Sequence, residues 1–150
     1  NRLRTVIGTL MLLPGVPCIF YGDEIGIQGY GDPFCRSTFD WERVNDENEA
    51  LKIYKRFIAL RKSTPCFSKG DFKPVYTHEN TFGFLRTYKD EKYIILVNYG
   101  KTFDNIRLDI SAFCSKTLKN IEIEEQIYTS DGIFYIGIPA HEVTIYKLSD

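Results

Sequence analysis

Residues 14–24 read PGVPCIFYGDE, a stretch that joins a turn, an apolar run and two adjacent carboxylates. Pro14 and Gly15 predict the end of a helix over residues 1–13, because neither residue continues a helix well. Residues 16–21 are apolar almost throughout, which is typical of a parallel strand buried on both faces. A helix, a tight turn and a buried strand in this order predict one unit of an α/β fold.

A long loop and a second helix follow this stretch. Residues 22–48 are rich in Gly, Asp and Asn with little periodicity, and a loop of that length is usually functional when it is ordered. A helix is expected over residues 47–63, capped by Asp46 or Asn48 and ended before Pro65. Its predicted buried face consists of residues spaced three and four apart, namely Leu51, Tyr54, Phe57, Ile58 and Arg61.

Beyond Pro65 the sequence changes to short β-rich runs separated by turn signals such as SDG at residues 130–132. Regular spacing of this kind predicts an antiparallel β-sandwich joined by hairpins. The expected strands cover residues 72–76, 81–88, 93–98, 105–110, 118–123, 133–138 and 143–148. We therefore expect a mainly β chain with a domain boundary that separates residues 1–65 from an all-β domain of residues 66–150.

The chain has 150 residues, of which 43% are hydrophobic and 26% charged, enough for one core but too few for a large enzyme. Its 19 basic and 20 acidic residues leave a net charge of −1, so electrostatics give no argument for a nucleic-acid or membrane partner. The apolar run at residues 10–13 is far too short to span a bilayer. Since the sequence starts at Asn1 and its one methionine is Met11, we expect an excised segment with any targeting signal upstream.

The four cysteines, Cys18, Cys35, Cys66 and Cys114, are widely spaced and have no His at metal-ligand spacing. The pattern therefore predicts neither a zinc site nor a disulfide framework. Reduced thiols and a cytoplasmic location are the expectation. Nothing in the sequence indicates a metal or a cofactor.

Residues 14–24 resemble the last barrel-strand signature of the α-amylase family, glycoside hydrolase family 13, commonly P-G-x-P-x-[IL]-[YF]-Y-G-D-E. Residues 32–36, DPFCR, followed by Phe39 and Trp41, resemble the cyclomaltodextrinase and neopullulanase branch, in which D-P-x-C-R precedes W-[DE]. The helix ending in ALRK at residues 59–62 is similar to the last barrel helix of that family, which commonly contains x-L-x-x-L-R. The resemblance is specific from the barrel-strand signature to Trp41 and looser afterwards.

In that family a (β/α)8 barrel is followed by an antiparallel sandwich, and a complete barrel needs about 250 residues. The resemblance therefore implies that residues 1–65 hold only the last helix–strand–helix part of the barrel, whose partner is the missing amino-terminal barrel portion. It also implies a cytoplasmic parent enzyme that hydrolyses α-glucosidic bonds of maltooligosaccharides, cyclodextrins and other α-glucans with retention of configuration.

The resemblance implies that no catalytic residue lies in this chain. Retaining glycosidases use two carboxylates about 5 to 5.5 Å apart, and the family carries its catalytic carboxylates on earlier barrel strands, upstream of Pro14. We therefore expect the chain by itself to be inactive. Asp23 and Glu24 are neighbours on an extended chain and point in opposite directions, so the prediction for them, together with Tyr21, is a loop-organising role.

The resemblance assigns Asp32 and Arg36 to substrate binding. A carboxylate accepts hydrogen bonds from vicinal hydroxyls and a guanidinium donates in a fixed fork, so a close pair suits a sugar. The alternative is a surface salt bridge that only holds the loop. Phe39 and Trp41 are expected in a core rather than stacked on a sugar ring, since large aromatic residues near a helix start usually close a core.

A second function is open for the β-domain, that of a non-catalytic carbohydrate-binding or interdomain-packing module. A binding module is expected to display at least two exposed aromatic side chains on one sheet face or loop rim, and a packing module an apolar patch. His78 and His141 have no partner at triad or metal spacing and are interpreted as surface or turn histidines.

Overall fold

The computed structural model describes residues 2–113 and 115–149, and these residues form three helices and eight strands. The helices are α1 (Arg2–Leu12), α2 (Glu49–Ser63) and α3 (Pro65–Lys69), and short 3-10 turns occupy Asp23–Ile25, Phe34–Arg36, Trp41–Arg43 and Ser111–Phe113. The strands are β1 (Asp71–His78), β2 (Thr81–Tyr88), β3 (Glu91–Asn98), β4 (Asp104–Asp109), β5 (Thr117–Asn120), β6 (Gln126–Tyr128), β7 (Ile133–Ile138) and β8 (Glu142–Ser149). Among the helices described, none is long and apolar enough to cross a membrane.

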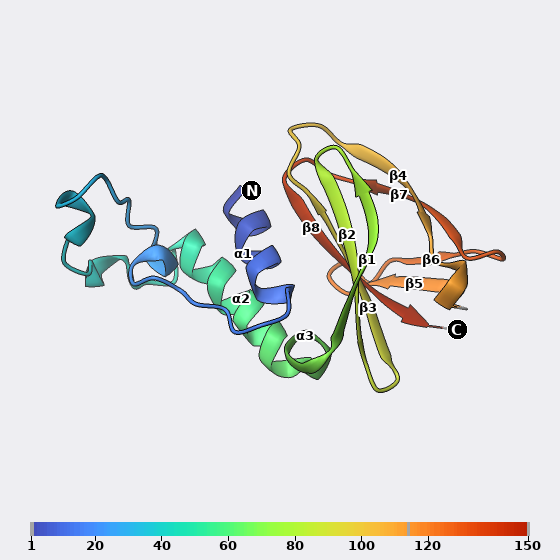
Figure 1. Ribbon diagram of the computed structural model, residues 1–150. Coiled ribbons are helices and arrows are strands. Elements are labelled where there is room, and N and C mark those ends of the chain that lie inside the picture. The colour runs from blue at the N-terminus through green and yellow to red at the C-terminus, as the bar shows by residue number, and fades with distance from the viewer. Residues whose placement is uncertain (1, 114, 150) are drawn as a thin grey trace.

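Two antiparallel sheets pack face to face in the carboxy-terminal part of the chain (Figure 1). The larger sheet has the strand order β1-β2-β3-β8-β5-β6, and the smaller sheet pairs β4 with β7. Successive side chains of a strand point to opposite faces, so alternate residues of β4 and β7 turn inward. The core between the sheets consists of Leu85, Ile94, Leu96, Ile106, Leu108, Ile110, Leu118, Phe134, Ile136, Ile138, Tyr146 and Leu148. The predicted antiparallel β-sandwich is confirmed.

The helices cover the other face of the larger sheet, which is therefore the middle of three layers (Figure 1). α1 contacts β3 and β8, α3 contacts β2 and β3, and α2 packs against α1. Because β3 and β8 are covered on both faces, their central residues form almost continuous apolar runs. The core on this side consists of Ile7, Met11, Leu12, Tyr54, Phe57, Cys66, Phe67, Phe84, Tyr93, Ile95, Val97, Val143 and Ile145.

Two buried arginines join the helices to the sheet through backbone carbonyl groups. Arg86 on β2 is fully buried and donates hydrogen bonds to the carbonyls of Leu12, Gly70 and Asp71. Arg61 on α2 donates to carbonyls at the end of α1 and in the turn that follows it. Burial lowers the pKa of both guanidinium groups. The last carbonyls of a helix have no partner within it, and these arginines supply the missing donors.

The second predicted helix is confirmed together with one of its two proposed caps. α2 begins after Asn48, whose side-chain oxygen accepts a hydrogen bond from the Leu51 N–H at 3.1 Å. Three side chains of the predicted face are buried, namely Tyr54, Phe57 and Arg61. The helix therefore owes its position to the apolar spacing seen in the sequence.

The strand predicted over residues 16–21 is wrong. This segment is irregular, and the Val16 side chain is 95% exposed. A buried parallel strand needs neighbours that bond its backbone and cover both of its faces. No strand that the structure describes pairs with this segment.

Other differences concern short elements. α3 and β6 are absent from the prediction because each is too short to show a periodic pattern. The strand predicted over residues 118–123 ends at Asn120, whose side-chain oxygen accepts a hydrogen bond from the Glu122 N–H and so starts a turn. The domain boundary near residue 65 stays a prediction. α1 and α2 share a core with the larger sheet, so packing alone does not separate two domains there.

Candidate functional site

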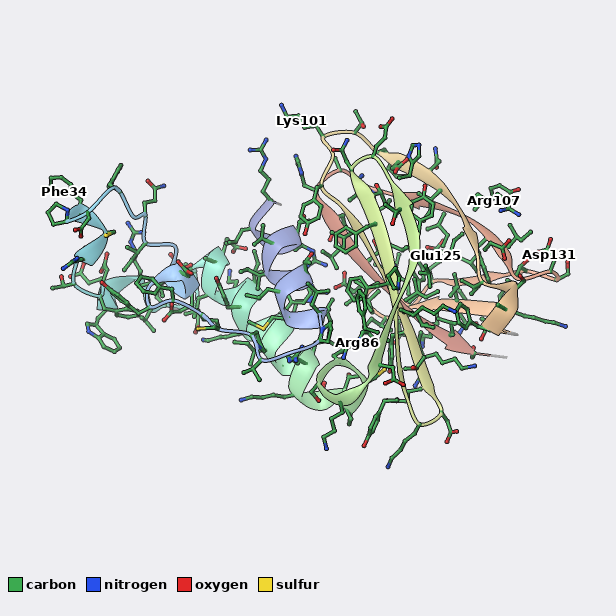
Figure 2. All side chains as sticks on the ribbon, in the orientation of Figure 1. Phe34, Arg86, Lys101, Arg107, Glu125 and Asp131 are labelled. Carbon is green, nitrogen blue, oxygen red and sulfur yellow. The ribbon has the colours of Figure 1, made fainter. Side chains whose placement is uncertain are left out.

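The long loop between α1 and α2 extends away from the β-strands (Figure 1), and Figure 2 places Phe34 at its far end. Asn48, the cap of α2, also holds the base of this loop. Its amide nitrogen donates to the carbonyls of Ile25 and Arg43 at 3.1 and 2.9 Å. The Arg43 guanidinium in turn donates to the Gly26 carbonyl at 3.0 Å. Residues 25–26 and 43–48 are therefore tied together, and the residues between them project outward.

Asp32 and Arg36 lie on the projecting part of the loop and form a fork. Arg36 Nε is 2.7 Å from Asp32 Oδ1, and Arg36 Nη2 is 3.3 Å from Asp32 Oδ2. The 3-10 turn Phe34–Arg36 brings the two side chains together. Both are open to solvent, with 64% of the Asp32 side chain and 74% of the Arg36 side chain exposed. The Cys35 thiol also donates to Asp32 Oδ1 at 3.8 Å. The role of the pair in substrate binding stays a prediction.

Tyr21 and Glu24 make contacts within the loop. The Tyr21 hydroxyl donates to the Ser37 carbonyl at 2.9 Å, which ties the start of the loop to its projecting part. The Glu24 carboxylate accepts a hydrogen bond from the backbone N–H two residues before it at 2.8 Å. Burial, and then the negative charges of Asp23 and Glu24, raise the pKa of Tyr54 on α2. These contacts are of the kind that hold a loop in one conformation, and the assigned role stays a prediction.

Trp41 is 75% exposed, so the expectation that it closes a core is wrong. Phe39 is half-buried, and its ring centroid lies 4.7 Å from that of Trp41. The two rings pack on each other because the loop projects beyond the helices and the sheet, where the described chain provides no core for them. Together with Tyr30 they line an open groove of about 710 Å³.

The described cysteines are free thiols. Cys18 and Cys35 are exposed and Cys66 is buried, while Cys114 lies outside the described residues. Burial raises the pKa of the Cys66 thiol to about 11, so this thiol is protonated at neutral pH and is a poor nucleophile. Within residues 2–113 and 115–149, no group of three or more His, Cys, Asp and Glu side chains is arranged to hold a metal ion.

Two polar side chains that position the helices and the loop, Arg86 and Arg43, were not predicted from the sequence. Arg86 follows Phe82 and Phe84 at every second position of β2, so an arginine on the core face of a strand was the available signal. Arg43 offers no comparable signal, because its partner Gly26 lies 17 residues away in an aperiodic loop.

These features define a class of protein, a β-sandwich domain joined to a helix–loop–helix segment that carries exposed polar and aromatic side chains. The family model described as Alpha-amylase C-terminal domain matches residues 70–146. The chain belongs to this family.

Relatives and solved structures agree with this assignment. The chain is 30% identical over 136 residues to the maltogenic α-amylase of Bacillus acidopullulyticus, and this match covers 88% of this chain and 23% of that protein. It is 34% identical over 97 residues to the cyclomaltodextrinase of Thermoanaerobacter pseudethanolicus, and this match covers 65% of this chain and 17% of that protein. The crystal structure of an Anoxybacillus α-amylase superposes with a TM-score of 0.85 at 26% identity, over 98% of this chain and 32% of that one. The chain thus spans less than a quarter of these two relatives, and the predicted resemblance to the α-amylase family is confirmed.

Proposed function

We propose that this chain is the carboxy-terminal part of an α-amylase-type glycosidase that acts on the α-glucosidic bonds of maltooligosaccharides, cyclodextrins or other α-glucans. The observation that carries the proposal is the extent of the match to maltogenic α-amylase. This match covers 88% of the chain and therefore includes residues outside the β-sandwich. The reaction is a double displacement with retention, and its two carboxylates belong to the rest of the enzyme. The isolated chain is therefore inactive.

Residues 1–65 complete a (β/α)8 barrel in this proposal. α1 exposes Leu3, Val6 and Leu10, and the segment after it exposes Val16 and Phe20. An amino-terminal barrel portion packed on this surface would remove these apolar side chains from water. It would also give the segment after α1 the neighbouring strand that a buried parallel strand requires.

Asp32 and Arg36 hold a sugar unit of the substrate, while Tyr21, Asp23 and Glu24 keep the loop in place. The fork supports this role because it presents carboxylate acceptors and guanidinium donors side by side on an exposed surface. Trp41 adds an exposed aromatic face, which suits the C–H groups of a sugar ring.

Substitution of Asp32 in the enzyme with its complete barrel tests this role. Asp32→Asn should lower kcat/KM for maltooligosaccharides by about 10- to 100-fold, because a hydrogen bond to a charged group contributes about 1.5 to 3 kcal/mol. Glu49→Gln is the matched control, since Glu49 forms an exposed pair with Lys52 on α2, and kcat/KM should not change. Equal activities in the two variants would mean that the fork only holds the loop.

We place the enzyme in the cytoplasm. The proposal is supported by the intracellular maltogenic amylase of Bacillus subtilis, which is 33% identical over 111 residues. Immunodetection of the full-length protein in fractionated cells tests the location. Recovery from the culture medium or the membrane fraction would contradict it.

A second candidate function rests on the outer face of the smaller sheet. Tyr135 on β7 is 76% exposed, and the Phe103 ring covers the backbone of Gly137 on the same face. Arg107 is the cross-strand partner of Tyr135. Two exposed aromatic rings beside a guanidinium are what a carbohydrate-binding module displays.

Affinity electrophoresis of this chain in gels that contain amylopectin tests the binding module. Tyr135→Ala should abolish the retardation. Tyr128→Ala is the control, because Tyr128 is a similarly exposed tyrosine on β6 in the other sheet. Equal retardation of both variants would exclude a site on the smaller sheet.

A further inference from the structure

A cavity of about 520 Å³ opens between the amino-terminal end of α1 and three turns of the β-domain. Its basic lining residues are Arg2 on α1, Lys101 in the turn after β3 and His141 in the turn before β8, and Asn80 and Thr102 add polar groups. Figure 2 shows Lys101 at the edge of the β-domain, beyond the start of α1. Among the described residues that line the cavity, none is acidic.

Buried Asn98 fixes two of the three turns. Its side-chain oxygen accepts a hydrogen bond from the Gly100 N–H at 2.7 Å. Its nitrogen donates to the carbonyls of Thr102 at 2.9 Å and Pro139 at 3.2 Å. The His141 N–H donates to the Gly100 carbonyl at 3.1 Å. The turns that carry the lysine and the histidine are therefore held against each other.

Tyr99 joins the remaining walls of the cavity. Its N–H donates to the Asn80 carbonyl at 2.8 Å, and its hydroxyl donates to Thr9 Oγ1 on α1 at 3.1 Å. Its ring stacks on Phe82 with a centroid distance of 5.7 Å. The cavity is thus formed in advance by hydrogen bonds within the protein, which lowers the entropy that a ligand loses in ordering it.

The basic side chains of this cavity have no salt-bridge partner among the described residues. Within the described chain, no carboxylate forms an ion pair with Arg2, Lys101 or His141. Glu142 is adjacent in sequence to the histidine but pairs with Arg4 instead. Basic groups gathered in one concave site create a positive potential that attracts anions.

We propose that this cavity binds a phosphate-bearing anion. The guanidinium of Arg2 and the ammonium of Lys101 supply charged donors for phosphate oxygens, and Asn80 and Thr102 supply neutral donors. The volume also accommodates a sugar attached to the phosphate, for which the ring of Tyr99 is an exposed neighbour. This site is separate from the loop assigned to the glycosidase substrate.

A titration of this chain with inorganic phosphate, followed by the amide chemical shifts in NMR spectra, tests the proposal. The shifts should saturate with a Kd on the order of 1 mM and concentrate in residues 99–102 and 139–141. Lys101→Gln and Arg2→Gln should each weaken binding by about threefold or more, because each removes one exposed charge contact. Lys55→Gln removes an exposed lysine on α2 outside the cavity and should leave the Kd unchanged.

Glucose 1-phosphate distinguishes the two sources of the phosphate group. Tighter binding of glucose 1-phosphate than of inorganic phosphate identifies a sugar phosphate, and equal binding identifies the free anion. His141→Asn provides a further variant with an intact backbone, since His141 has a φ of 52° and Asn tolerates this conformation. Shifts that do not saturate, or equal weakening by the Lys55 and Lys101 substitutions, would overturn the proposal.

Discussion

Arg86 is a charged side chain at the centre of the packing between helices and sheet (Figure 2). A buried charge is costly unless hydrogen bonds replace its water, and here the carbonyls of Leu12, Gly70 and Asp71 do so. These carbonyls lie at the end of α1, directly after α3 and at the start of β1. One guanidinium therefore fixes three elements at the point where the chain passes from helices to strands.

Arg86→Met should lower the free energy of unfolding by about 3 kcal/mol, because methionine fits an apolar site but leaves buried carbonyls without donors. Urea-unfolding curves measure the loss. Arg107→Met on the exposed face of β4 is the matched control and should change the free energy by less than about 0.5 kcal/mol. Equal effects would mean that the buried hydrogen bonds contribute nothing specific.

The buried Cys66 thiol predicts a dependence of stability on pH. Burial raises its pKa from the ordinary 9.0 to about 11. A folded-state pKa above the unfolded value contributes stability that is present below the unfolded pKa and is lost as pH rises through the folded one. The free energy of unfolding should therefore fall more steeply between pH 9 and 11 in the unchanged chain than in Cys66→Ala. Parallel pH profiles would contradict this explanation.

At the scale of elements, Asn48 serves both α2 and the loop before it. Its side-chain oxygen caps the helix, and its nitrogen holds the carbonyls of Ile25 and Arg43. A helix cap and a loop anchor in one side chain couple the position of the loop to the helix. The fork of Asp32 and Arg36 is thereby carried on a base that is fixed at both ends.

Asn48→Ala should lower the free energy of unfolding by about 1 to 2 kcal/mol, since it removes a helix cap together with the loop contacts. Asp46→Ala is the control, because Asp46 was the other candidate cap and does not cap α2. Thermal unfolding followed by circular dichroism compares the two variants. A loss of similar size in Asp46→Ala would show that the cap at Asn48 contributes nothing specific to the helix start.

The sequence predicted those elements whose burial is decided by nearby residues. α2 and the long strands β2 and β7 were found because their apolar spacing matches their own period. The strand at residues 16–21 and the core position of Trp41 were wrong, because both depend on surfaces that residues 2–113 and 115–149 do not provide. The carbonyl partners of Arg86 and the cavity beside α1 were not predictable, because each combines residues that are distant in sequence.

At the scale of the whole molecule, ion pairs join the helices to the β-domain in addition to the shared core. Arg4 on α1 pairs with Glu122 and Glu142, and Arg56 on α2 pairs with the same Glu122. Salt screens such partly buried pairs less than exposed ones. Because a shared core and these ion pairs join them, the helices and the sandwich form one packed unit. The loop with the predicted sugar site projects from this unit (Figure 1).

Sugar release from maltooligosaccharides and cyclodextrin, measured for this chain and for a longer protein with the upstream barrel strands, tests the central claim most directly. We expect hydrolysis by the longer protein and none by this chain, because we propose that the two carboxylates that retaining hydrolysis requires belong to the upstream barrel strands. Hydrolysis by this chain alone would contradict the account and would make Asp23, Glu24 or Asp32 a catalytic residue. An inactive longer protein would contradict the assignment to an α-glucan glycosidase.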